Sequence, residues 1–403
     1  MAAQALNAPD GAGSGRRAVA VANGAHVLHD GLSDLLYVFF PIWQAALGLD
    51  YASIGVLKAC YSGGMASFQL AATRLAGRIG HGPVLAAGTA LAGAGFVAAA
   101  NAGGFAGLAA ALLIAGAGAA AQHPLGSDIV ARMTPPARRR QALGLYNTVG
   151  DIGKVLFPAL ATGALLVMPA AAVLDGIGAV AIVAGGLILA ALPAIAPPRP
   201  AAGEPAGNPA VATPAVFRQP GFAVLFGVGM IDTAARAGFL TFFPLALAAK
   251  GAAIGTIGLA LTLVFVGGAI GKFVCGPLGA RFGVFWTVAV TEGATAAGAL
   301  AAPAAPLWLA LVLVPVIGIA LNGTSTVLYG TVPELVPEAA RSRAFGLFYT
   351  GTIGAGAATP IVLGLVSDAL SLPAAMAGLA GFVLAAPVLT LALRAPLARL
   401  RAG

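Results

Sequence analysis

Apolar segments of about 20 residues, the length that a helix needs to cross a lipid bilayer, recur along the whole chain. Hydrophobic residues make up 59% of the 403 residues and charged residues only 8%, whereas about 25% of a soluble domain is charged. Together with a mean hydropathy of +0.95, this predicts an integral membrane protein. The spanning segments are expected to be helices, because the short alternating pattern of membrane-spanning strands is absent.

The apolar runs predict twelve transmembrane helices, six on each side of a break rich in proline and alanine. Residues 193–220 form this break, and their composition is typical of a flexible linker. The predicted helices cover 18–47, 53–76, 83–101, 105–132, 141–167, 173–194, 219–248, 253–279, 284–302, 306–332, 342–369 and 373–396. The predicted organisation is a cytoplasmic N-terminal tail (1–17), a six-helix bundle (18–195), a cytoplasmic linker (196–218), a second six-helix bundle (219–397) and a cytoplasmic tail (398–403).

The placement of Lys and Arg predicts the orientation of the chain. Most of the 21 basic residues fall in the tails and in alternate loops, and basic residues of short loops stay in the cytoplasm. Lys250 alone falls in a loop of the other set. Both termini are therefore expected in the cytoplasm. The net charge of +8 then reflects topology rather than nucleic-acid binding.

The two halves of the chain resemble each other. Phe39-Phe40-Pro41 recurs 203 residues later as Phe242-Phe243-Pro244, and "PPARRRQALGLYNT" (135–148) aligns with "PEAARSRAFGLFYT" (337–350) at a shift of 202. A six-helix unit repeated in the same orientation is an architecture of secondary transporters. The chain therefore resembles the major facilitator superfamily, which implies the major facilitator fold, with two six-helix bundles related by a pseudo-two-fold axis.

Three short motifs are similar to the fosmidomycin-resistance-like branch of that superfamily. They are His26, Asp30 and Pro41 at their spacing, "QHPLGSDIVAR" (122–132) and "GDIGKVLFP" (150–158). This resemblance implies a proton-driven exporter of small molecules that alternates between inward-open and outward-open states. It also implies a protein that works without a cofactor, and we expect a monomer.

The chain departs from the superfamily pattern in its cytoplasmic loops. "TRLAGRIG" (73–80) and "GPLGARFG" (276–283) retain the gating arginines, Arg78 and Arg281, but have Gly77 and Ala280 where the family has an acid. The resemblance thus leaves open what closes the cytoplasmic face. In the fifth predicted helix, Phe157 precedes Pro158 where many antiporters have glycine, which keeps uptake or facilitated diffusion as an alternative.

The stretch "HVLHDGLSD" (26–34) places titratable groups within a membrane helix, where each charge costs about 2.5–3.5 kcal/mol or more. His26, Asp30 and Asp34 are spaced four residues apart and share one helix face. Carboxyl and imidazole groups that are alternately dried and hydrated can bind and release a proton. We predict that this row, with Asp151, couples transport to protons; at a shift of 203 the row has no copy.

Other polar residues are candidate substrate contacts, because they fall on helices that line the cavity in this superfamily. They are Lys154, Arg236, Lys272, His123, Asn147, Asn322 and Tyr349. Asp151–Lys154 and Asp232–Arg236, at i to i+3 and i to i+4, can instead neutralise each other within their helices. Glu292 is expected on a peripheral helix, and Lys58 is expected to extend outward to the membrane surface.

Two other classes of function remain open from the sequence. His26, His29, Asp30 and His123 have the ligand types of a transition-metal site, which would make the chain a metal transporter. His29 and Asp30 diverge by about 100° around their helix, which disfavours a shared ion, and we predict no resident metal. A membrane-embedded hydrolase could use the same residues, but a duplicated scaffold is explained by alternating access and not by hydrolysis, so we expect no enzyme.

Overall fold

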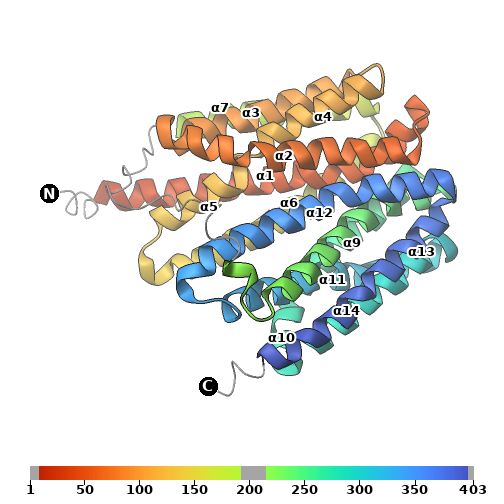
Figure 1. The fold of residues 1–403 in the computed structure, drawn as a ribbon. Coiled ribbons are helices and arrows are strands. Elements are labelled where there is room, and N and C mark those ends of the chain that lie inside the picture. The colour runs from red at the N-terminus through yellow and green to blue at the C-terminus, as the bar shows by residue number, and fades with distance from the viewer. Residues whose placement is uncertain (1–8, 192–214, 398–403) are drawn as a thin grey trace. The chain divides into compact units, whose positions relative to one another are not determined.

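In the first half of the chain, the computed structural model contains six membrane-length helical segments (Figure 1). The structure describes residues 9–191 and 215–397. Most of the predicted linker and the ends of both predicted tails lie outside these residues. The helices are α1 (Pro9–Leu47), α2 (Tyr51–Ile79), α3 (His81–Ala100), α4 (Phe105–Ala119), α5 (Gln122–Met133), α6 (Pro136–Leu165) and α7 (Ala170–Ala191). α4 and α5 together form one span, Phe105–Met133.

The second half also contains six segments of this length, two of which are joined without a loop in the long helix α10. The helices are α9 (Phe222–Ala249), α10 (Ile254–Ala304), α11 (Leu307–Thr331), α12 (Arg341–Ala369), α13 (Leu372–Val383) and α14 (Ala385–Thr390). α10 has 51 residues and breaks at Gly283, whose φ of 83° lies in the left-handed region that favours glycine. α10 therefore crosses twice, as the sequence predicts. α13 and α14 belong to one span, Leu372–Leu397.

These segments confirm an all-α membrane fold with twelve spanning helices in the described part of the chain. Eight helices are long and apolar enough to cross a membrane by length and composition alone, and α10 accounts for two crossings. α1, α2 and α6 bring the number to twelve; they have 39, 29 and 30 residues. These three helices carry several of the polar residues predicted to be functional, which lowers their hydropathy. The described residues include no strand.

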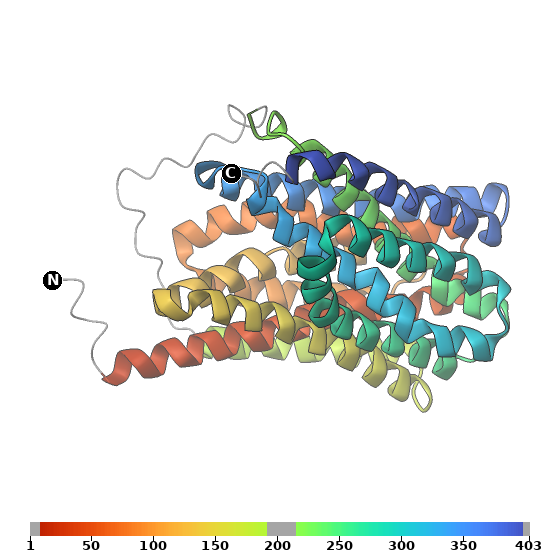
Figure 2. The ribbon, with the colours of Figure 1, turned by 90° about the horizontal axis from the view of Figure 1, so that it is seen from below.

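Contacts divide the chain into two compact units. Unit 1 comprises residues 1–36 and 60–203, and unit 2 comprises residues 37–59 and 204–403. In unit 1, α3 packs against both α4 and α7. In unit 2, α10 packs along α11 and α9 packs against α12; Figure 2 shows α10 and α11 side by side. The domain boundaries predicted from the sequence stay a prediction.

Glycine allows the close contact of α3 with α7. A Cβ atom at Gly93 would lie 2.5 Å from the Gly178 carbonyl oxygen, and one at Gly185 would lie 2.7 Å from the Ala86 carbonyl oxygen. Between helices in lipid, the hydrophobic effect supplies little attraction, so dispersion contacts and close backbone approach stabilise the pair. The abundance of glycine, 57 residues, thus has a structural use.

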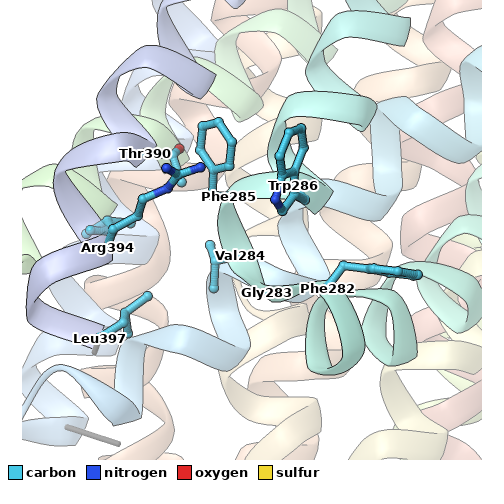
Figure 3. A pocket seen from close by; sticks show the side chains of 9 residues that line it. Phe282, Gly283, Val284, Phe285, Trp286, Thr390, Arg394 and Leu397 are labelled. Atoms are coloured by element: carbon cyan, nitrogen blue, oxygen red, sulfur yellow. The ribbon is translucent and has the colours of Figure 1, made fainter. Parts of the chain in front are cut away.

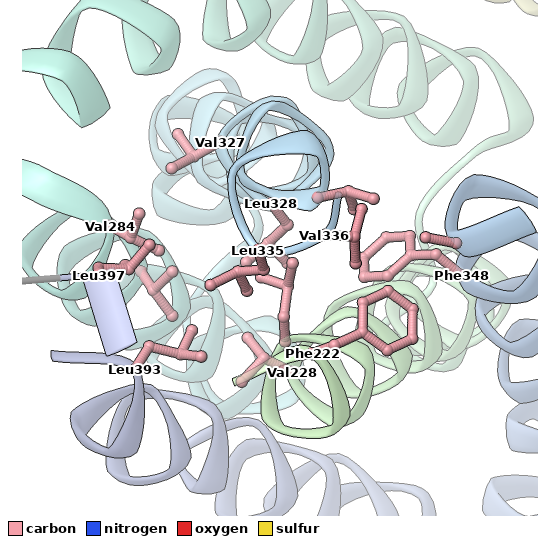
Figure 4. Close-up of a cluster of buried hydrophobic side chains, with 14 of the residues drawn as sticks. Phe222, Val228, Val284, Val327, Leu328, Leu335, Val336, Phe348, Leu393 and Leu397 are labelled. Atoms are coloured by element: carbon pink, nitrogen blue, oxygen red, sulfur yellow. The ribbon is translucent and has the colours of Figure 1, made fainter. Parts of the chain in front are cut away.

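A cluster of large apolar side chains joins the helix ends within unit 2 (Figure 4). Phe222 and Val228 of α9 pack there with Leu328 of α11 and Phe348 of α12. Phe222 and Phe348 are almost fully buried. The cluster packs together the ends of the helices that carry the polar groups of unit 2.

Lys250, the basic residue that falls outside the usual loops, has a local structural role. It is the C-cap of α9, and its Nζ donates hydrogen bonds to the carbonyl oxygens of Ala302 and Ala305 at 2.6 and 2.5 Å. These carbonyls lie at the end of α10, where a helix leaves acceptors unpaired. Partial burial lowers the pKa of Lys250. Its position therefore serves helix capping and does not argue against the predicted orientation.

The N-terminus of α2 is capped by two carboxylates within unit 2. The Ser53 amide donates to Asp50 Oδ1 at 2.8 Å, and the amides of Tyr51 and Ala52 donate to the two carboxylate oxygens of Asp368 at 2.9 and 2.8 Å. Three of the four unpaired amides of this helix end are thereby satisfied. The hydrogen bonds from Ser53 also hold the pKa of Asp50 below its usual value.

Replacing Asp50 tests this cap. Asp50→Ala should lower the free energy of unfolding by about 1 kcal/mol at neutral pH, measured by thermal unfolding in detergent. Because the folded-state pKa of Asp50 is lowered, its contribution is present above its ordinary pKa and is lost as the pH falls through the lowered value.

Asp50→Asn is the matched control, since asparagine caps a helix about as well as aspartate and does not titrate. It should keep the neutral-pH stability. Equal destabilisation by both substitutions would show that Asp50 does not act as a cap.

Candidate functional site

Asp30 of α1 is the centre of a cluster of charged and titratable side chains inside unit 1. Its side chain is buried, and three basic groups surround the carboxylate. His26 Nε2 lies 3.4 Å and His123 Nε2 3.7 Å from Oδ1, and Lys154 Nζ lies 3.4 Å from Oδ2. The helices α1, α5 and α6 each supply part of the cluster. His26 and Asp30 are one turn apart on α1, as their spacing of four predicts.

The ring of His26 is held in one orientation by α6. The Nδ1 atom of His26 lies 2.8 Å from the Tyr146 carbonyl oxygen. The His26 ring also stacks on the Tyr146 ring, with the two centroids 4.1 Å apart. Because a carbonyl can only accept, Nδ1 carries a proton and donates it. In the neutral ring, Nε2 is then a bare acceptor that faces the Asp30 carboxylate. An attractive contact between the two therefore requires one further proton.

Asp151 and Lys154 complete the cluster from α6. Lys154 Nζ lies 3.5 Å from Asp151 Oδ1, at a distance similar to its contact with Asp30. Asp151 is buried, whereas 30% of the Lys154 side chain is exposed. Lys154 therefore bridges two carboxylates while part of its side chain stays exposed, and it is not paired with Asp151 alone.

The formal charges of this cluster explain what it can do. Asp30 and Asp151 contribute two negative charges and Lys154 one positive charge, which leaves one negative charge when both histidines are neutral. Burying net charge is costly, and the basic groups around the Asp30 carboxylate offset part of this cost.

Gly150 is a residue of the site that the sequence analysis missed. A Cβ atom there would lie 2.6 Å from Asp30 Oδ2 and 2.8 Å from His26 Nε2. One turn further along α6, Gly153 lets the backbone pass close to Val27 and Gly31 of α1. The motif "GDIGK" contains both glycines, and their spacing of three was the available signal.

His29, the second histidine of α1, points to a different partner. Its Nε2 lies 2.9 Å from Thr89 Oγ1, and Thr89 donates its own hydroxyl proton to the Leu85 carbonyl oxygen at 2.8 Å. Thr89 therefore accepts from His29, which is a neutral ring with a proton on Nε2. His29 is thus a neutral hydrogen-bonding residue between α1 and α3.

In unit 2, Arg236 and Asp232 lie on one face of α9, as their spacing predicts. Arg236 Nη2 is 3.9 Å from Asp232 Oδ2, and Arg236 Nη1 donates to Ser325 Oγ of α11 at 3.4 Å. The Asp232 side chain is buried, and Glu292 of α10 is hydrogen bonded to it. Glu292 therefore contacts polar groups inside the unit.

Several predicted substrate contacts lie outside these two clusters. Asn147 of α6 is exposed, and Tyr349 of α12 is exposed beside Tyr329, with ring centroids 6.5 Å apart. Asn322 of α11 donates to the Gly318 carbonyl oxygen of its own helix at 3.3 Å. Their roles stay predictions.

Two lysines and one aspartate complete the set. Lys272 of α10 and Asp34 of α1 are half-buried, and the proposed roles of both remain predictions. Lys58 is buried, with 7% exposed, and its Nζ lies 4.8 Å above the Tyr37 ring. The expectation that Lys58 extends to the membrane surface is therefore wrong, because the aromatic face of Tyr37 holds the cation inside.

The gating arginines Arg78 and Arg281 are exposed at the ends of their helices. Close to Arg78 in the sequence, His81, the first residue of α3, pairs with an acid from another helix. His81 Nε2 lies 2.6 Å from Asp128 Oδ2, to which Arg132 Nε also donates at 2.8 Å. Asp128 of α5 thus ties the start of α3 to the last turn of α5. The pairing of Asp128 with Arg132 fits their i to i+4 spacing, whereas the contact with His81 depends on how the helices pack.

A cavity of about 700 Å³ lies at the α10 break in unit 2 (Figure 3). Gly283, Phe285 and Trp286 line it from α10, and Leu397 lines it from the C-terminal segment. The Arg394 guanidinium lies 4.0 Å from the centroid of the Phe285 ring. Gly283 leaves room beside this cation–π contact, which joins the two helix ends.

Comparison with known proteins identifies the class. The family model described as Major Facilitator Superfamily matches residues 24–251 and 225–402. A bacterial homolog of the human lysosomal transporter Spinster is 15% identical, with a TM-score of 0.76 over 93% of this chain and 96% of its own. The nucleoside transporter NupG is 16% identical, with a TM-score of 0.77 over 94% and 100% of the two chains.

A third solved structure, of the peptide transporter POT in complex with sulfate, is 16% identical, with a TM-score of 0.72 over 98% of this chain and 96% of its own. No curated protein matches the chain significantly. The chain belongs to the Major Facilitator Superfamily. It is therefore a multi-pass membrane transporter with the twelve-helix major facilitator fold, and the low identities to the solved structures define the fold alone.

Replacing Gly150 tests the packing of the site. Gly150→Ala should lower the free energy of unfolding by about 1–3 kcal/mol, because the added methyl group collides with Asp30 and His26. Thermal unfolding in detergent measures the change.

Gly144→Ala on the same helix is the control, since a Cβ atom there has nothing within 4 Å. It should be neutral or slightly stabilising, because alanine favours helix over glycine. If the two substitutions have the same effect, the close approach at Gly150 is not required.

Proposed function

We propose that this protein is a proton-coupled secondary transporter that exports a small polar or anionic compound, or a drug, by alternating access. It would act in a bacterial inner membrane, with both termini in the cytoplasm, as a monomer. The observation that carries the proposal is the position of Asp30, which is 6% exposed and lies between two histidines and a lysine. Such a group within a membrane helix is functional by default, because its cost would otherwise be avoided.

The cluster supports a coupling of proton binding to anion binding. With no proton bound, Lys154 contacts both Asp30 and Asp151, so its charge is satisfied within the protein. A proton that binds at His26 or Asp30 removes one of these attractions, and Lys154 then gains from pairing with an anionic group of a substrate. Loss of the proton restores the original contacts and displaces the substrate. The Asp30 carboxylate and the substrate thereby compete for one cation, so proton binding and substrate binding favour each other.

The distances fit such a competition. The contacts of Asp30 with His26, His123 and Lys154 are 3.4–3.7 Å, longer than the roughly 2.7–2.9 Å of a tight charge-assisted hydrogen bond. The exposed part of Lys154 gives an incoming anion access to the cation. His123, 30% exposed, is placed to share in the same contact. We therefore assign the proton to His26 and Asp30, with Asp151 and Asp34 assisting, and the substrate to Lys154 and His123.

The resemblance to fosmidomycin-resistance proteins suggests the first compound to test. Fosmidomycin is a small phosphonate anion, which matches a site whose available group is a lysine. In unit 2, Arg236 is a second candidate contact, 24% exposed, with Lys272, Asn322, Asn147 and Tyr349 as further candidates and Arg78 and Arg281 as gating residues. Uptake of an organic anion is the alternative direction, and counterflow in inside-out and right-side-out vesicles separates the two.

A transition metal is a second candidate substrate. One ligand atom from each of His26, Asp30 and His123 can be found within 4.8 Å of the others. Zinc requires ligand distances of about 2.0–2.2 Å, so the three groups would have to close around an ion. The ammonium of Lys154, 3.4 Å from the same carboxylate, opposes a bound cation. An anionic substrate is therefore the better supported of the two.

Proteoliposomes with an imposed pH gradient test the proposal. Asp30→Asn should reduce gradient-driven accumulation of the transported compound at least about tenfold, a loss of about 1.4 kcal/mol of coupling free energy. The panel contains fosmidomycin and other small anionic, zwitterionic and cationic compounds, and one arm adds a chelator.

Asp175→Asn is the control, because Asp175 accepts from Asn101 Nδ2 at 3.1 Å, at the ends of α3 and α7 and outside the cluster. It should transport as the wild type does. Full gradient-driven accumulation by Asp30→Asn would refute the assignment of the proton site. Loss of transport by the wild type on addition of a chelator would favour the metal alternative.

A further inference from the structure

We propose that Asp232 and Glu292 form a second proton-binding site, in which the two carboxyl groups share one proton in the interior of unit 2. This site lies in the half of the repeat that lacks the row of His26, Asp30 and Asp34. The proposal extends the proposed function from one proton site to two. It rests on that function only for the use of the proton in transport, and the binding of the proton is tested separately.

The contact between the two acids comes from separate helices. Asp232 lies on α9 and Glu292 on the second half of α10, with exposed fractions of 3% and 1%. Their carboxyl groups are hydrogen bonded to each other. Two ionised carboxylates in contact repel each other and have no proton to share, so the contact is favourable when one of them is a carboxylic acid. The proton is therefore part of the structure of the contact.

The surrounding groups are arranged to hold one negative charge. Arg236 Nη2 lies 3.9 Å from Asp232 Oδ2 and is the positive partner from α9. From α11, Thr324 is hydrogen bonded to Glu292, and its Oγ1 donates to Thr291 Oγ1 of α10 at 2.7 Å. Asp232 as the carboxylate, Glu292 as the acid and Arg236 as the cation sum to zero. Without the proton, the buried group carries one net negative charge, which is costly in a dry interior.

Tyr329 of α11 is the remaining titratable group beside the pair. It lies within electrostatic range of Asp232 and Arg236, and Thr352 of α12 is hydrogen bonded to it. A phenol stays neutral at physiological pH, so it adds no charge to the sum. The proton therefore responds mainly to the hydration of Asp232, Glu292 and Arg236. Water that enters beside Arg236, 24% exposed, would stabilise the fully ionised pair and release the proton.

The internal repeat shows that the fold itself does not require acids at this helix crossing. At the shift of 203 residues, Asp232 corresponds to His29 and Glu292 corresponds to Thr89. In unit 1 these two residues make a neutral hydrogen bond of 2.9 Å between α1 and α3. The same crossing is thus stabilised without charge in one unit and with a carboxyl pair in the other. A purely structural contact would be served by the neutral pair at lower cost.

The two units consequently show a similar charge pattern. Asp30, Asp151 and Lys154 in unit 1, and Asp232, Glu292 and Arg236 in unit 2, are each two acids with one permanent cation. Each set reaches neutrality with one additional proton. The row of His26, Asp30 and Asp34 has no copy at the shift of 203, and the unit 2 pair is instead assembled across two helices. Two proton sites provide for the coupling of two protons to one substrate.

Infrared spectroscopy of the purified, reconstituted protein tests the site without any substrate. The wild type at neutral pH should show the C=O stretching band of a protonated carboxylic acid, with an amplitude of one group per chain, that shifts in heavy water. Glu292→Gln should remove this band. Asp232→Asn should also remove it, because ionised Glu292 and Arg236 are then neutral together without a bound proton. Each variant informs on its own if the other fails to fold.

Two further variants separate this proposal from the first. Glu334→Gln, at an exposed acid, is the matched control and should leave the band unchanged. Asp30→Asn should also retain it, so failure of the unit 1 assignment does not affect the result. A wild type without the band at neutral pH, or a Glu292→Gln protein with the full band, would overturn the proposal.

Discussion

The cost of placing the Asp30 carboxylate inside a membrane helix governs the construction of unit 1. An unpaired charge there is unfavourable by several kcal/mol, and the protein offsets this cost with groups from three helices. Lys154 gives a permanent positive charge, and His26 gives one that depends on a proton. Gly150 allows α6 to approach closely enough for these contacts. The electrostatic requirement thus determines which residues the helices can have where they meet.

Neither cluster reaches neutrality through its permanent charges alone. If Asp30 had one lysine and no further acid, the pair would be static and would need no proton. The second acid in each unit, Asp151 in one and Glu292 in the other, leaves a single negative charge that a proton can neutralise. This excess makes the helices sensitive to hydration, which changes between the states of a transporter. The free-energy cost of burying the unneutralised charge therefore differs between the dry and the hydrated state of each cluster.

Much of this molecule is predictable from its sequence, because the membrane restricts the possible structures. Helix number follows from the apolar runs, and the break of α10 at Gly283 falls between two predicted spans. The contacts of Asp30 with His26 and of Asp232 with Arg236 follow from their spacing of four on one helix. Local periodicity is enough for each of these, since both partners belong to one element.

Contacts between helices were not predictable in the same way. The hydrogen bond of His26 with the Tyr146 carbonyl oxygen, the contact of Glu292 with Asp232 and the burial of Lys58 all depend on how the helices pack. One of them had a signal in the sequence. At the shift that relates the two halves, Glu292 and Asp232 correspond to two residues of similar depth, Thr89 and His29, so the repeat places the acids at one crossing.

The central claim is that a proton bound at the Asp30 cluster drives transport, and movement of protons is its most direct measure. Proteoliposomes that enclose a pH-sensitive dye can be exposed to each compound of the panel without an imposed gradient. For a transported compound, the internal pH should change in the wild type because protons cross the membrane during transport, and it should stay constant with Asp30→Asn. Transport of the compound by the wild type with no change in internal pH would contradict the account.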